Sequence, residues 1–343
     1  MSTNYIYSPG DRSGFRCRVP LSSTRQVFVV DGKVVKSADA KVADFIGDDG
    51  GFVLRLKENE ILEEMLQVIF VRENGDNLLK YSTDIFLGAN SSAKLLLCSH
   101  TLSQSPFKME EKIPIRLEEG AFLDIVVMQN EHNNAIHHTD FEINMSKGAK
   151  LRLNIITLHG GDISNTFVVN LNGVNADCEL NGLYLSDEKQ KVSTHVDLNH
   201  NAPECKSLQL FKGILNGESV THFKGRILVA QDSQKTEAYQ ANNNLLVSKT
   251  AKAYTQPHLE IYADDVKCSH GASVGSLDPE ELFYMRSRGI SLHEAKLLQQ
   301  QAFAHAVLYK VSNSELRERL ADLVEKRLRG EFTHCSDCSK HCC

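Results

Sequence analysis

The chain has 343 residues, 41% of them hydrophobic and 24% charged, which is ordinary for a soluble globular protein that buries a large core. Its formal net charge of −6 gives no general affinity for nucleic acid or for an anionic membrane surface. No uninterrupted apolar run approaches the roughly 18–20 residues that span a bilayer, so we expect no membrane segment.

The cysteine usage and the first residues point to a reducing compartment. The opening run MSTNYIYSPGDRSG lacks the apolar segment of a secretory signal. Nine cysteines are few for the length, scattered and odd in number, which argues against a disulfide framework. We therefore expect reduced thiols and a cytoplasmic protein.

Most of the chain has the pattern of short β-strands. About 25 residues without an amphipathic helix precede the first strand-like run, QVFVVDGKVV. From about residue 51 to residue 266, extended segments alternate with Gly, Asn and Asp. The clearest are AFLDIVVMQ, AKLRLNIITLHGG, NTFVVNLNG, ADCELNGLYLS and THFKGRILVA. No helical pattern intervenes, which excludes a doubly wound α/β sheet.

The strand pattern leaves two architectures open. Strand starts recur roughly every 10–14 residues, which suits a sandwich or barrel and also a β-helix of stacked coils. No crisp internal repeat is present, a mild argument against a regular solenoid. Asn-Gly pairs are expected in tight turns because both residues tolerate positive φ, at positions 172–173, 181–182 and 216–217.

After residue 275 the pattern becomes helical. Asp278 followed by proline reads as an N-cap with proline at the first helical position. Capping boxes that begin at Ser291 and at Ser312 predict a second and a third helix. The expected inward stripe of the second helix is Leu292, Ala295, Leu298, Ala302, Phe303 and Ala306, and that of the third is Leu316, Leu320, Leu323, Val324 and Leu328.

These helices carry an excess of basic residues. Between residues 286 and 330 there are nine Lys and Arg against five Asp and Glu. A solvated helical face is the structural interpretation, and a docking surface for an acidic partner is the functional one.

The most informative candidate functional residues lie in residues 256–290, QPHLEIYADDVKCSHGASVGSLDPEELFYMRSRGI. Alternate residues on a strand share a face, so Cys268 and His270 point the same way, roughly 6–7 Å apart along the chain. A thiolate and an imidazole together suit iron, zinc or copper(I). Two donors are too few to hold a metal, so a site here needs ligands from elsewhere. The structural interpretation is a packed cysteine beside a hydrogen-bonded histidine.

The C-terminal tail THCSDCSKHCC is a second candidate metal site. Its C-x2-C spacing allows two thiolates of one loop to coordinate zinc or iron. The six donors are His334, Cys335, Cys338, His341, Cys342 and Cys343. A tail with adventitious thiols is the structural interpretation, whereas a mobile metal carrier is the functional alternative.

Motifs of the common enzyme classes are missing. There is no G-x4-G-K-[ST] loop, no G-x-G-x-x-G, no H-E-x-x-H and no G-x-S-x-G, so we expect neither ATP hydrolysis nor another catalytic activity. The alternative is a β-helix enzyme acting on extended polysaccharide, with Asp264 and Asp265 as acid or base. Adjacent strand residues face opposite ways, and the chain has no Trp platform for sugars, which argues against this function. The other histidines (His137, His138, His159, His195 and His200) are expected in structural or surface roles.

The segment from 256 to 290, together with SVTHFKGRILVAQDSQKTEAYQANNNLLVS and KSLQLFKGIL, resembles the SufB/SufD family of the SUF iron–sulfur cluster assembly machinery. The pairing of DDVKCSHGA with LFYMRSRGI is specific, and SHGA stands where SufB-type subunits have an EHEA-like run. The chain therefore resembles the SufD type. This resemblance implies a right-handed parallel β-helix core over residues 49–277, a C-terminal helical module over 278–330 and a Cys/His-rich tail over 331–343. We expect residues 1–48 to be a short N-terminal extension in which the helical domain that usually precedes the core is absent or truncated.

The resemblance also implies a function and partners. It describes a non-catalytic scaffold that pairs with a SufB-like paralogue, or with itself in isolation, and that docks a SufC-like ABC ATPase on its C-terminal helices. Arg286, Arg288 and Lys296 lie in that docking region. His270, with Cys268 beside it, would face the subunit interface and bind iron or a nascent cluster transiently, with no permanently bound cofactor. Polar residues such as Lys212 or His200 could line a route for sulfur species inside the core.

Overall fold

The computed structural model describes residues 21, 24–34, 42–44, 50–72, 78–101 and 106–330. Two sheets account for most of them, and strands that follow one another along the chain alternate between the two sheets from β4 onward. The Cys/His-rich tail, with the metal site predicted in it, lies outside the described residues.

The first sheet, sheet A, has ten strands: β1 (Thr24–Val30), β2 (Lys33–Val34), β5 (Met65–Arg72), β7 (Ser92–Thr101), β9 (Phe122–Asn130), β11 (Lys150–His159), β13 (Asp177–Ser186), β15 (Lys206–Leu215), β17 (Thr236–Leu246) and β19 (Val266–Ser276). The second, sheet B, has nine: β3 (Val42–Asp44), β4 (Gly50–Leu56), β6 (Leu78–Leu87), β8 (Phe107–Leu117), β10 (Ala135–Met145), β12 (Asp162–Leu171), β14 (Lys191–His200), β16 (Val220–Val229) and β18 (Lys252–Ile261).

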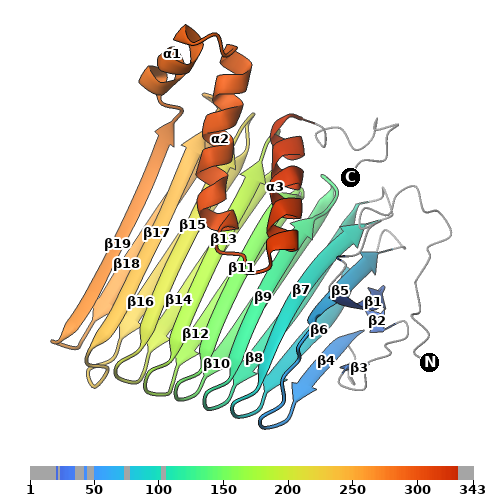
Figure 1. Cartoon of the computed structure of the whole chain (residues 1–343), viewed down its shortest axis with the longest axis vertical. Coiled ribbons are helices and arrows are strands. Elements are labelled where there is room, and N and C mark those ends of the chain that lie inside the picture. The colour runs from blue at the N-terminus through green and yellow to red at the C-terminus, as the bar shows by residue number, and fades with distance from the viewer. Residues whose placement is uncertain are drawn as a thin grey trace.

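The two sheets form stacked coils, which confirms the parallel β-helix (Figure 1). Within each sheet the strands from β4 onward pair in parallel with the strand one coil further along. Register partners such as Lys150 and Asp177 are 27 residues apart, whereas Lys206 and Glu237 are 31 apart. The coil length therefore varies, which explains why the sequence shows no crisp repeat.

The Asn-Gly turns are only partly as predicted. Gly217 lies in a turn with a φ of +61°, a conformation that favours glycine, and positions 172–173 also lie between strands. The prediction for Asn181 and Gly182 is wrong, because both lie in the middle of β13. Glycine is needed there for space: a Cβ on Gly182 would lie 2.3 Å from the ring of Phe211 on the next coil.

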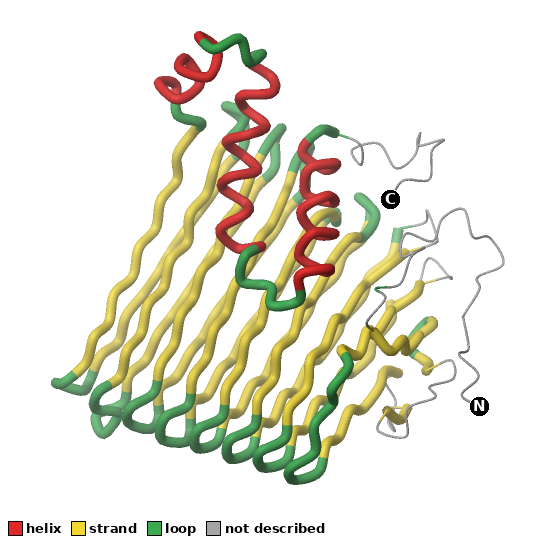
Figure 2. The backbone as a smooth tube through the Cα atoms, viewed as in Figure 1, coloured by secondary structure: helices red, strands yellow, loops and turns green. Residues whose placement is uncertain are grey.

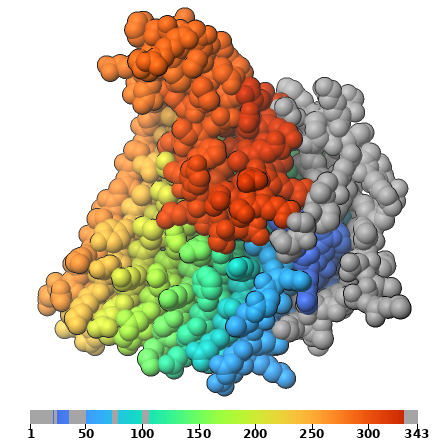
Figure 3. Space-filling model, viewed as in Figure 1, coloured from blue at the N-terminus to red at the C-terminus, as the bar shows by residue number. Residues whose placement is uncertain are grey.

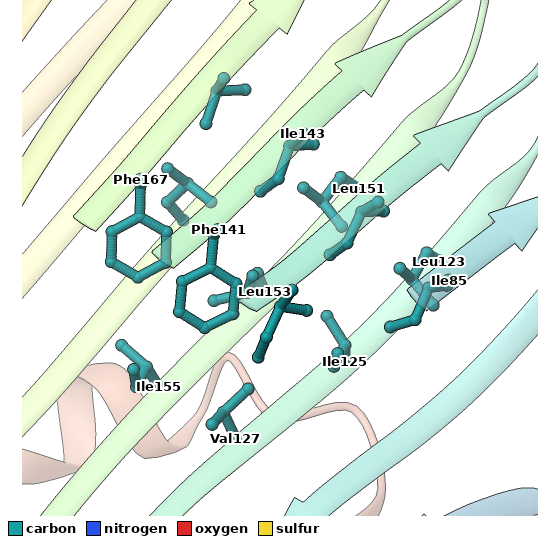
Figure 4. Packing of buried hydrophobic residues seen from close by; sticks show 14 of the residues in the cluster. Ile85, Leu123, Ile125, Val127, Phe141, Ile143, Leu151, Leu153, Ile155 and Phe167 are labelled. Atoms are coloured by element: carbon teal, nitrogen blue, oxygen red, sulfur yellow. The ribbon is translucent and has the colours of Figure 1, made fainter. Parts of the chain in front are cut away.

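Inward-facing side chains of both sheets form one continuous hydrophobic core. From β8 to β16, the strands of sheet B alternate strictly between buried and accessible residues, as a sheet with one solvated face should. Phe141 and Phe167, on neighbouring strands of that sheet, stack at a centroid distance of 4.5 Å (Figure 4). Leucine, isoleucine and valine from sheet A pack against them from the opposite side.

Three helices close the described chain: α1 (Pro279–Ser287), α2 (Leu292–Leu308) and α3 (Ser314–Leu328). Helices α2 and α3 lie across the outer face of sheet A and bury a second apolar cluster against it, whereas α1 projects beyond the strand ends (Figure 2). They cover only part of that face (Figure 3). The predicted caps Asp278 and Ser291 are confirmed.

Two helical details were predicted wrongly. Asn313 caps α3 in place of Ser312, whose hydroxyl instead donates to Asp124 on β9. The inward stripe of α2 is also rotated: Leu292 and Leu298 are about two-fifths exposed. The buried residues of α2 are Ala295, Leu297, Gln300, Ala304, Val307 and Leu308.

Candidate functional site: the terminal coil

The last coil of the solenoid leaves both sheets open. β19 ends the strand order of sheet A and β18 ends that of sheet B, and no described strand pairs with their outer edges. These edges are 11 and 10 residues long. Unpaired N–H and C=O groups along such edges are a template for pairing with another strand.

Cys268 and His270 both lie on β19, at alternate positions. Cys268 is half-buried and packs against the core, whereas His270 is exposed. Burial raises the pKa of the Cys268 thiol, while a backbone hydrogen bond from Ala238 opposes the shift. The thiol is therefore protonated at neutral pH, and His270 is the more available donor of the two.

The interior behind this coil is polar. The Tyr184 hydroxyl donates to Asn244 Oδ1 at 2.6 Å and accepts from Asn242 Nδ2 at 3.0 Å. Burial raises the pKa of Tyr184 to about 12, and hydrogen bonds with Asn242, Thr221 and Asn244 moderate the shift. Our sequence reasoning missed this network. The alternation in EAYQANNNLL could have revealed it, because Gln240, Asn242 and Asn244 take the inward positions.

A second buried polar group lies further along the solenoid. His137 Nδ1 lies 2.7 Å from Glu131 Oε1, and its Nε2 lies 3.5 Å from Glu111 Oε2. All three side chains are at most 4% exposed. Burial alone would lower the pKa of His137, but the charges of Glu131 and Glu111 and their hydrogen bonds raise it to about 10. This buried position between two carboxylates favours the protonated ring.

The structure separates the two residues that could line a sulfur route. His200 lies inside the core, its Nε2 2.9 Å from Ser207 Oγ, and burial lowers its pKa to about 4. Lys212 does not lie inside: its ammonium stands 4.2 Å from the ring centroid of Phe303 on α2. An interior role for Lys212 is therefore wrong, because its position on β15 faces the helices.

The projecting helix α1 carries an apolar and basic surface. Phe283 is 74% exposed and Tyr284 56% exposed. Arg288 lies over the Tyr284 ring at 4.3 Å, and Arg286 is exposed beside it. Within the described residues, Arg286, Arg288 and Lys296 form no salt bridge, whereas Lys326, Arg327 and Arg329 at the end of α3 do.

The two aspartates considered as an acid–base pair are surface residues. Asp264 and Asp265 are exposed in the turn between β18 and β19, where the Asp265 N–H donates to Gln234. Among the described residues no three His, Cys, Asp or Glu side chains are grouped closely enough to hold a metal ion. No helix in the described part of the chain is both long and apolar enough to cross a membrane.

The fold and the terminal coil define a class: a two-sheet parallel β-solenoid with an exposed imidazole on its last strand and a helical module against one face. The family described as "SUF system FeS cluster assembly, SufBD core domain" matches residues 70–303, and the chain belongs to this family. It is SufD-like.

Named relatives agree with this assignment. The iron–sulfur cluster assembly protein SufD of Escherichia coli is 31% identical over 254 residues, 74% of this chain and 60% of that protein. A SufBD family protein of Mycobacterium leprae is 30% identical over 64% of this chain and 58% of its own length. One from Synechocystis is 31% identical over 67% of this chain and 51% of its own. The chain thus spans about half to three fifths of the relatives' length.

Proposed function

We propose that this chain is a non-catalytic scaffold subunit of iron–sulfur cluster assembly in the cytoplasm. It pairs with a SufB-like paralogue, or with a second copy of itself in isolation, through the open edges of β18 and β19. The family membership and the unpaired edges support this pairing. We also propose the division of the chain into a core over residues 49–277 and a helical module over 278–330.

The observation that carries the proposal is the exposure of His270 on an edge strand. A neutral imidazole there donates one ring nitrogen to iron while the partner subunit supplies sulfur ligands. Iron or a nascent cluster then binds transiently at the subunit interface and is not a permanently bound cofactor. Cys268, protonated and half-buried, packs behind the histidine.

Replacing His270 with alanine is expected to lower cluster formation at least about tenfold while leaving the fold and the subunit pairing intact, because the side chain is exposed and only its donor nitrogen is lost. The measurement is the rate of appearance of cluster absorbance in the reconstituted complex of this chain with its paralogue and ATPase. His258→Ala, an exposed histidine on the outer face of β18, is the matched control. A normal cluster yield from the His270 variant argues against the proposed site.

The apolar and basic surface of α1 is proposed to dock a SufC-like ABC ATPase. Exposed aromatic rings beside arginines are typical of interface hot spots. Arg286, Arg288 and Lys296, without salt bridges in the described part of the chain, supply the positive charge for an acidic face of the ATPase.

Replacing Phe283 with serine is expected to weaken ATPase binding at least about tenfold, because a largely exposed aromatic anchor is removed at little cost to folding. The change in Kd is measured by calorimetry. Ile136→Ser, on the bare outer face of sheet B, removes an exposed apolar side chain of similar kind and serves as the control. Equal affinities for both variants would place the docking surface elsewhere.

A further inference from the structure

Three polar residues line up across the last three coils of sheet A. Gln209 on β15 pairs in register with Gln240 on β17, and Gln240 pairs in register with His270 on β19. All three take inward-facing positions of their strands. Neighbouring strands lie about 4.8 Å apart, so in-register polar side chains are within reach of one another.

The two glutamines already form the first step of a hydrogen-bonded ladder. Gln240 Nε2 donates to Gln209 Oε1 at 2.8 Å. Both side chains are at most 3% exposed, yet Gln240 Oε1 and Gln209 Nε2, the two ends of this short chain of amides, have no hydrogen-bond partner among the described residues. A buried acceptor without a donor destabilises the folded state, so its retention needs an explanation.

The Gln240 amide is held tightly in its place. It packs against Gly225 on β16, where an added Cβ would lie 2.4 Å from Nε2 and 2.7 Å from Oε1. The backbone of Gly225 therefore lies so close to the Gln240 amide that only glycine fits at this position. The amide is fixed on one side by Gln209 and on the other by sheet B, and the remaining in-register neighbour is His270.

We propose that Gln240 is the positioning residue for His270. Its unpaired amide oxygen accepts the N–H of one imidazole nitrogen, which fixes the tautomer and leaves a lone pair on the other nitrogen. This inference adds to the proposed function and rests on it only for the identity of the metal. The acceptor fixes the ring in the tautomer that can act as a ligand before any iron binds.

The test reads the tautomer of His270 directly. Long-range ¹H–¹⁵N correlation spectra of protein labelled at its histidine ring nitrogens distinguish Nδ1–H from Nε2–H. The chain has 14 histidines, so the His270→Gln variant assigns the signal. We expect one dominant tautomer in the natural chain. Gln240→Met, similar in shape but without an acceptor, should lower the tautomer ratio about five- to tenfold.

Three further variants make the result specific. Gln240→Glu keeps an acceptor and should retain the dominant tautomer. Asn243→Ala, which removes an exposed hydrogen bond to Ser273 on the other face of β17, should change nothing. Gly225→Ala displaces the amide without removing it, and should act like the methionine variant.

A tautomer ratio that is unchanged in both the Gln240→Met and the Gly225→Ala proteins overturns the inference. An amide turned end for end would stabilise the opposite tautomer by donating to the ring, and finding that the glutamate variant inverts the ratio also overturns it. None of these spectra requires iron. A failed cluster assay with an intact tautomer effect therefore counts against the proposed function alone.

Discussion

Replacing Arg327 with methionine is expected to destabilise the protein by about 3–5 kcal/mol, the usual cost of leaving one partner of a buried ion pair uncompensated. Its guanidinium binds Asp187 through two bonds of 2.7 Å and also donates to the Leu158 carbonyl at 2.9 Å. Arg327 is 5% exposed and Asp187 8% exposed. The pair joins the end of α3 to the turn between β13 and β14. Its loss should therefore weaken the packing of the helical module against the solenoid.

The measurement is urea unfolding, with the free energy taken from the transition midpoint and slope. Lys326→Met, one residue away, removes an exposed salt bridge to Asp322 and should cost less than about 1 kcal/mol. Combining Arg327→Met with Asp187→Asn removes the buried charge, so the double variant should recover part of the loss. A single variant as stable as the natural chain would show that the module is held by apolar contacts alone.

The strand pattern predicted the class of secondary structure well but could not choose an architecture. Alternation of apolar and polar residues is the same in a sandwich and in a solenoid, because it reports only which face of a strand is buried. The decisive information is the register between coils, and from β4 onward its spacing varies from 26 residues between β10 and β12 to 32 residues between β16 and β18. The family resemblance supplied what the periodicity lacked.

The helical errors have the same origin. Caps at Asp278 and Ser291 depend on neighbours within three residues, and these were predicted correctly. The hydroxyl of Ser312 instead donates a hydrogen bond to Asp124, which is 188 residues away in the sequence. No local sequence pattern predicts such a contact. Likewise, α2 has apolar residues on more than one side, and only the position of sheet A decides which side is buried.

The candidate site was predictable in part. His270 was singled out through the resemblance, and its register with Gln240 followed only from the structure. His137 could not have been distinguished from its neighbour His138 by composition. The adjacent positions face opposite sides of β10, so one ring is buried between carboxylates and the other is accessible.

That buried imidazole leads to the second large effect: the protein should lose stability as pH rises above neutrality. The pKa of His137 is about 10 in the folded protein and about 6.5 in an unfolded chain. Below pH 6.5 both states hold the proton, so the stabilisation is fully present. Between 6.5 and 10 only the folded state holds it, and stability falls by about 1.4 kcal/mol per pH unit.

From pH 7 to pH 8.5 the expected loss is therefore about 2 kcal/mol, measured by urea unfolding at each pH. The matched variant combines His137→Gln with Glu131→Gln, which replaces the charged pair with a neutral one of similar shape. Its stability should change little over this range. Burial raises the pKa of the thiols of Cys178, Cys205 and Cys268, which also lowers stability at high pH, but it does so in both proteins and cancels in their difference.

The proton can also be followed at the ring itself. If Glu131 and Glu111 hold the imidazolium between them, the ring signals of His137 stay constant from pH 6 to pH 8.5. Removing the nearer carboxylate with Glu131→Gln leaves Glu111, at 3.5 Å, as the carboxylate beside the ring, so titration of His137 should move toward neutral pH. A ring that already titrates near 6.5 in the natural chain would contradict the buried cation, since a neutral imidazole gives no linkage of stability to pH in this range.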